Sequence, residues 1–136
     1  MRIGLLASNA ALAQYFVAAL ALADHTVTLY PTRHDLITAL TAAASEQGGA
    51  SHELLLLELI VDERGRQALA GLSGLAKDLG LPIIVLTTVS RDAIALAQAA
   101  FPAVCLRQLP LPLRDLLALI EALRPSVPSS TRSSSE

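Results

Sequence analysis

The stretch HELLLLELIVDERG, residues 52 to 65, decides the fold, because four consecutive leucines are followed at once by a glutamate. An apolar run without alternation is typical of a strand buried on both faces, which is the usual state of strands in a parallel sheet. Proteins with such sheets commonly place chemistry at the carboxyl ends of the strands. Glu58, which ends the run, is therefore the first candidate for a functional residue.

Other apolar runs with strand character lie on both sides of this stretch, and segments of helical length separate them. The predicted strands are Ile3–Ala7, Thr26–Tyr30, Leu54–Leu59, Ile83–Thr87 and Val104–Leu106. Five helices are predicted. The first two begin after the capping residues Asn9 and Thr32, and the other three cover about 65–79, 91–100 and 113–123.

Five strands alternate with five helices, and a strand comes first. This order predicts an α/β fold, a three-layer α/β/α sandwich around a five-stranded parallel sheet. The flavodoxin-like strand order 2-1-3-4-5 is the common solution at this length. Residues 1–124 are expected to form this one domain. Residues 125–136 hold six serines and two prolines, so we expect a flexible tail or the beginning of a linker.

Composition narrows the possible functions. The formal net charge is −2, which argues against a surface for nucleic acid or for an anionic membrane. The three histidines are scattered without cysteine or carboxylate at ligand spacing, so we expect no metal site and surface or loop positions for them. The turn after the first strand, ASNA, lacks the glycines of a dinucleotide fingerprint, and we expect no cofactor. Cys105 is interpreted as a small core residue.

The amino-terminal segment loosely resembles a secretory signal, with a positive start and a long apolar stretch. Ser8, Asn9 and Gln14 interrupt that stretch, and a strand, a polar turn and a helix explain it better. No apolar run reaches the roughly 18 residues expected of a membrane span. A single cysteine cannot form an intrachain disulfide, and a reducing compartment is the default. We therefore expect a cytoplasmic protein.

Four strings, taken in order, resemble the receiver domain of bacterial response regulators, over about residues 2 to 123. RIGLLASNAAL (2–12) is similar to the first strand and the turn that follows it, and ELLLLEL (53–59) to the third strand. PIIVLTT (82–88) is similar to the fourth strand, which ends in a hydroxyl residue. LPLPLRDLLALIEAL (109–123) is similar to the Lys-Pro turn and the fifth helix.

The resemblance implies a phosphorylation site of which most residues are replaced here. The acidic pair that would bind Mg²⁺ maps to Ala7 and Ser8, the phospho-accepting aspartate to Glu58, and the lysine to Leu109. Among these positions, the hydroxyl of Thr87 keeps its family type. We therefore expect a degenerate receiver, or pseudo-receiver, that is not an enzyme and does not carry out phosphotransfer.

Two hypotheses for Glu58 remain open. Its carboxylate could mimic the phosphorylated state, with a hydrogen bond from Thr87 that holds a signalling-competent conformation. Alternatively it is a partly solvated strand-end carboxylate with no conformational role. In the resembling family an aromatic residue on the fifth strand reports the switch, and Leu106 stands there, so we expect the switch to be locked or discarded.

The first and fifth helices have more apolar side chains than a surface helix needs. Residues 10–23 carry no charge, and Val17, Leu22 and Leu119 lie off the expected core stripes. The topology places these helices side by side, so we expect an exposed apolar interface, most simply of a homodimer.

The sequence thus predicts a signalling module in a two-component-type system that works through protein–protein contact, with a protein partner or a linked output domain. Two alternatives remain: a receiver regulated by a small ligand or ion at the former acidic pocket, and a small flavodoxin-like enzyme or nucleotide binder.

Overall fold

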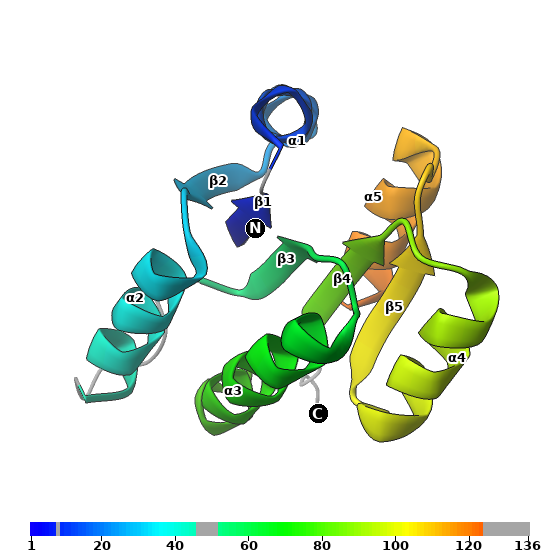
Figure 1. The fold of residues 1–136 in the computed structure, drawn as a ribbon. Helices are drawn as coiled ribbons and strands as arrows, with labels where there is room; N and C mark the ends of the chain where they lie inside the picture. The colour runs from blue at the N-terminus through cyan, green and yellow to red at the C-terminus, as the bar shows by residue number, and fades with distance from the viewer. Residues whose placement is uncertain (8, 46–51, 124–136) are drawn as a thin grey trace, which may run out of the picture.

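The computed structural model describes residues 1–7, 9–45 and 52–123. Its five strands form one parallel sheet in the order β2-β1-β3-β4-β5, which Figure 1 shows from one edge to the other. The predicted fold class and strand order are therefore confirmed. The strands are β1 (Arg2–Ala7), β2 (Thr26–Tyr30), β3 (Leu54–Glu58), β4 (Ile83–Thr87) and β5 (Val104–Gln108).

Helices follow each strand, as the alternating pattern predicts. They are α1 (Ala10–Leu22), α2 (Arg33–Ser45), α3 (Glu63–Leu79), α4 (Arg91–Ala100) and α5 (Leu113–Ala122). Two of the starts are fixed by the side chains expected from sequence. The side chain of Asn9 accepts a hydrogen bond from the Leu12 N–H at 3.0 Å, and Thr32 Oγ1 accepts one from the Asp35 N–H at 3.1 Å.

Some boundaries differ from the prediction. The third helix begins at Glu63 rather than at about Gly65, because the side chain of Asp62 caps it by accepting a hydrogen bond from the Gly65 N–H at 2.8 Å. The fifth strand extends to Gln108, beyond Leu106, because its exposed polar residues still pair with β4 through the backbone. Hydrogen bonding of the main chain does not depend on side-chain polarity, so a prediction from apolar residues alone underestimates the length of an edge strand.

Two apolar clusters hold the layers together. One face of the sheet packs against α2, α3 and α4, where Leu36, Leu40, Leu69 and Leu72 are fully or almost fully buried. The other face packs against α1 and α5 through Phe16, Leu20, Leu116 and Ile120. The central residues Leu54–Leu57 of β3 are 0% exposed and contribute to both clusters, which confirms a strand buried on both faces.

Within the described ranges, none of the helices combines the length and the apolar character that a bilayer crossing requires. Ser8, Arg124 and the predicted tail, 125–136, lie outside the described residues.

Candidate functional site

The carboxyl ends of the central strands bring most of the predicted site positions together. Ala7 and Glu58 are register partners on β1 and β3, and Glu58 is paired with Leu86 on β4. Thr87 follows directly, and its carbonyl oxygen accepts a hydrogen bond from the Leu109 N–H at 2.7 Å. The topology therefore places these residues at one edge of the sheet, as expected for a parallel α/β fold.

The side chains at this edge offer little for binding a divalent cation. Ala7 is buried and has no ligand atom, Glu58 is half-buried, and Leu109 packs against the α1/α5 cluster. Mg²⁺ is bound in proteins through carboxylates and other oxygen ligands. Among the described residues, no group of three or more histidine, cysteine, aspartate or glutamate side chains is placed to hold a metal ion.

The hydrogen bond between Thr87 and Glu58, which the mimic hypothesis requires, is not formed. Thr87 is 0% exposed, and its hydroxyl has no hydrogen-bond partner in the described part of the chain. The threonine side chain is fully buried at the end of β4. Of the two hypotheses for Glu58, the mimic of the phosphorylated state therefore lacks the hydrogen bond from Thr87 that it requires.

Leu106 takes an inward position on β5. It lies opposite Val85 in the sheet, is 3% exposed, and belongs to the cluster beneath α2, α3 and α4. A buried leucine has no polar atom that could report a change at Thr87, so the residue acts here as part of the core.

A cavity of about 400 Å³ lies beside Glu58, between the loop that leads into α2 and the loop that leads into α3. Its charged lining residues are Arg33, Arg64, Glu58 and Asp62, so two positive and two negative side chains face the same space. The sequence analysis did not predict the two arginines, because they lie more than 30 positions apart and neither belongs to the resembling strings.

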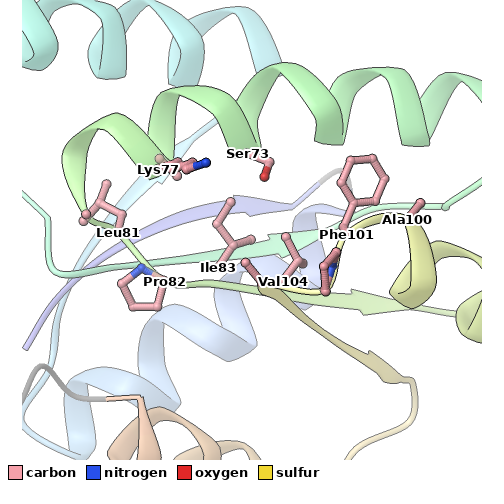
Figure 2. Close-up of a pocket in the computed structure, with 12 residues that line it drawn as sticks. Ser73, Lys77, Leu81, Pro82, Ile83, Ala100, Phe101 and Val104 are labelled. Atoms are coloured by element: carbon pink, nitrogen blue, oxygen red, sulfur yellow. The ribbon is translucent and has the colours of Figure 1, made fainter.

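A second cavity, of about 570 Å³, lies at the opposite end of the sheet (Figure 2). It is formed by the end of α3, the start of β4, the end of α4 and the start of β5, with Leu81, Ile83, Phe101 and Val104 among its apolar lining. Lys77 is the charged residue of this lining. This cavity shares no residue with the Glu58 edge and does not contain a predicted site residue.

The α1/α5 face contains an apolar groove of about 430 Å³. It is lined by Tyr15, Ala18, Ala19, Leu22 and Ala23 from the first helix region and by Leu113 and Leu117 from α5. Leu22 is 88% exposed and Tyr15 50% exposed. Val17 and Leu119, which the sequence analysis also assigned to this interface, are half-buried and pack against the inner cluster.

The remaining candidates have structural positions. Cys105 lies on β5 and packs against the α1/α5 cluster, as expected for a core residue. His25 and His52 lie in loops, which agrees with the expectation of surface or loop positions, and each is buried at 7% exposure. His34 is exposed on α2.

Comparison with solved structures finds the same fold in bacterial proteins. A protein from Burkholderia pseudomallei described as pilus assembly-related is 16% identical, with a TM-score of 0.71 over 90% of this chain and 88% of the other. A two-component response regulator from Clostridium difficile is 17% identical, with a TM-score of 0.70 over 90% and 94%. The chemotaxis protein CheY4 from Vibrio cholerae is 14% identical, with a TM-score of 0.68 over 90% and 97%.

These similarities establish a receiver-like fold. No protein-family model and no curated protein matches the chain. Because one fold can host many functions, the residues of the site decide the function of this chain.

Proposed function

We propose that this chain is a receiver-like signalling module of a two-component-type regulatory system in the cytoplasm, and that it acts through protein–protein contact without accepting phosphate. The similar structures include named response regulators, which supports the regulatory setting. The observation that carries the proposal is the edge of the sheet at Ala7, Glu58 and Leu109. Alanine and leucine there supply neither a metal ligand nor a counter-charge for a phosphoryl group.

Glu58 is then a strand-end carboxylate without a conformational role. The alternative, a mimic of the phosphorylated state, requires side chains that respond to the Glu58 carboxylate, namely a hydroxyl that binds it and an aromatic residue on β5. Neither the buried hydroxyl of Thr87 nor the leucine at position 106 supports such a role.

Contact between two copies is the simplest use of the α1/α5 face. Residues 10–22 carry no charge, and the groove between α1 and α5 is apolar, with the exposed Leu22 at its rim. In a two-fold arrangement, Leu22 of each copy would lie against the groove of the other. Burial of two leucines and two tyrosines would remove apolar area from water.

Measurement of the mass in solution tests this interface. Sedimentation of the wild-type chain across micromolar concentrations is expected to show self-association, with a dimer as the smallest assembled species. Leu22→Glu is expected to raise the dissociation constant about tenfold or more, because a central apolar contact becomes charged. Leu96→Glu on α4 is the matched control, since Leu96 is 68% exposed and lies on the opposite face. A wild-type monomer, or equal effects of both variants, would contradict the proposed interface.

Incubation with acetyl phosphate and Mg²⁺ tests the chemical part of the proposal separately. Intact-mass measurement is expected to show no phosphoryl addition, while a phosphorylatable receiver domain treated in parallel gains one. Phosphorylation of Glu58 would overturn the proposal.

The cavity beside Glu58 favours a second candidate, regulation by a small ligand at the former acidic pocket. Arg33 and Arg64 can bind a phosphate or carboxylate group, and Glu58 and Asp62 can accept hydrogen bonds from its donors. A ligand that raises the melting temperature of the wild type, but not of Arg33→Gln or Arg64→Gln, would support this candidate.

A further inference from the structure

The two outermost strands of the sheet, β2 and β5, differ in how their outward backbone groups are kept from pairing with a further strand. Beyond β5, the side-chain amide of Gln98 on α4 binds the backbone of the edge strand. Its Nε2 donates to the Val104 carbonyl at 2.6 Å, and its Oε1 accepts from the Leu106 N–H at 3.3 Å. In a parallel pair, every second residue of a strand bonds to the same neighbouring strand. Leu109 bonds to Thr87 of β4, so the odd-numbered residues of β5 face β4. The backbone groups of Val104 and Leu106 therefore face away from β4. Gln98 therefore occupies the positions that a further strand would use.

The opposite edge, β2, has no such protection in the described part of the chain. Thr26 donates its N–H to the Met1 carbonyl at 2.9 Å, so Thr26, Thr28 and Tyr30 bond to β1. The N–H and C=O groups of Val27 and Leu29 then point outward, and no hydrogen bond reaches them from the described residues. The strand TVTLY also lacks charge and proline, the devices that usually keep an open edge from pairing.

We propose that β2 pairs antiparallel with β2 of a second copy of this chain, which joins two five-stranded sheets into one continuous sheet. Figure 1 shows β2 at the end of the sheet with α1 and α2 on either side of it. This contact goes beyond the α1/α5 interface and uses a different surface.

One register satisfies all the outward groups. If Val27 lies opposite Leu29 of the other copy, each pair exchanges two hydrogen bonds and none of the four groups is left unpaired. A shift by two residues in one direction brings in His25, whose N–H already donates to the Leu20 carbonyl at 3.0 Å. A shift in the other direction brings in Pro31, which has no N–H. The strand is therefore complementary to itself in a single arrangement.

The side chains support the same arrangement. The two-fold axis passes between the two copies of Thr28, which is exposed, and paired threonines are favourable across antiparallel strands. Leu29, 37% exposed, would lie opposite Val27 of the other copy. Asp24 precedes the strand and Arg33 follows it, and both are exposed, so antiparallel pairing brings opposite charges to each end. The uncharged α1 beside β2 allows two copies to approach.

Lysine substitutions on the full chain test the register. Thr28→Lys places two like charges directly opposite each other at the axis, whereas Thr26→Lys places each lysine opposite Tyr30 of the other copy. Both threonines are exposed on the same face of β2, so the change in strand propensity is matched. We expect Thr28→Lys to raise the dissociation constant about tenfold or more and Thr26→Lys less than about threefold. An equimolar mixture of Thr28→Lys and Thr28→Glu should associate again.

The measurement is made in the wild type and in Leu22→Glu, which removes the proposed α1/α5 contact. Dimers of Leu22→Glu that dissociate with Thr28→Lys would support the β2 contact, whatever the outcome for α1/α5. A folded Leu22→Glu chain that is monomeric across micromolar concentrations, or equal effects of the two lysines, would overturn it. Oxidation of Thr28→Cys and Thr26→Cys in a Cys105→Ser background provides an independent readout. Cross-linking is expected for position 28 alone, and its absence there would also overturn the proposal.

Discussion

The hydroxyl of Tyr30, at the end of β2, and Nε2 of His52, just before β3, are joined by a hydrogen bond of 2.5 Å. The two rings meet edge to face, with centroids 5.6 Å apart. The His52 ring lies beside Gly4 of β1, where an added Cβ would come within 3.1 Å of its Cδ2 atom. A glycine on β1 therefore makes room for a buried histidine that links β2 to the start of β3.

This pair predicts a pH-dependent stability. Burial, and then the positive charge of Arg2, lower the pKa of His52 below its usual value of about 6.5. As the pH falls through that value, the unfolded chain binds a proton at His52 that the folded chain does not. The free energy of unfolding should therefore be fully retained above pH 6.5 and decrease below it.

Denaturant unfolding at several pH values checks this prediction. His52→Gln can keep a hydrogen bond with Tyr30 but does not titrate, so its loss of stability on acidification should be smaller than that of the wild type. His34→Gln, on the exposed surface of α2, serves as the control. Equal acid sensitivity of the wild type and His52→Gln would contradict the assignment.

Gly65 is expected to tolerate no side chain. Its N–H donates to the Asp62 cap at 2.8 Å, and a Cβ added to it would overlap the backbone carbonyl of Ile60. Gly65→Ala should lower the free energy of unfolding by about 2 kcal/mol or more, because backbone has to move. Gly71→Ala in the same helix meets no atom within 4 Å and should stabilise by about 0.5–1 kcal/mol. Thermal unfolding of the two variants measures the contrast, and a stable Gly65→Ala would show that the loop after Glu58 can adjust.

Thr87→Val is expected to leave the stability unchanged or raise it by about 1 kcal/mol, since the buried hydroxyl makes no hydrogen bond. If the hydroxyl were bonded to the Glu58 carboxylate, Thr87→Val would instead lower the free energy of unfolding. Ser90→Ala, which removes the cap of α4, provides a hydroxyl deletion that should cost about 1 kcal/mol. Chemical denaturation of both variants distinguishes a core position from a switch.

Gln98→Glu should destabilise the protein by about 1–3 kcal/mol, because a carboxylate cannot donate to the carbonyls of Phe101 and Val104. The same substitution at Gln108, which is exposed and donates to one carbonyl at 3.0 Å, should cost much less. Hydrogen exchange would locate the effect, with faster exchange at Leu106 expected in Gln98→Glu. Equal losses at the two positions would argue against protection of the β5 edge by Gln98.

Much of the fold could be predicted because it depends on local pattern. The leucine run 54–57 identified a strand buried on both faces, and the caps Asn9 and Thr32 fixed two helix starts. The alternation of strands and helices left few topologies, and right-handed crossovers favour the one observed. The site positions also fell at one edge, since the carboxyl ends of parallel strands coincide.

By itself, the sequence determined the layers, the strand order and the replacement of the acidic and lysine positions at Ala7 and Leu109. Tertiary structure alone decided which polar groups meet. Tyr30 and His52 are 22 positions apart and join over Gly4, whereas Thr87 ends beside Glu58 without bonding to it. Periodicity specifies the face on which a side chain lies, but a hydrogen bond depends on distance and direction to atoms from other elements. For the same reason, Leu22 is the more exposed of the two large apolar side chains that α1 exposes, Tyr15 and Leu22, whereas Leu119 packs against the inner cluster.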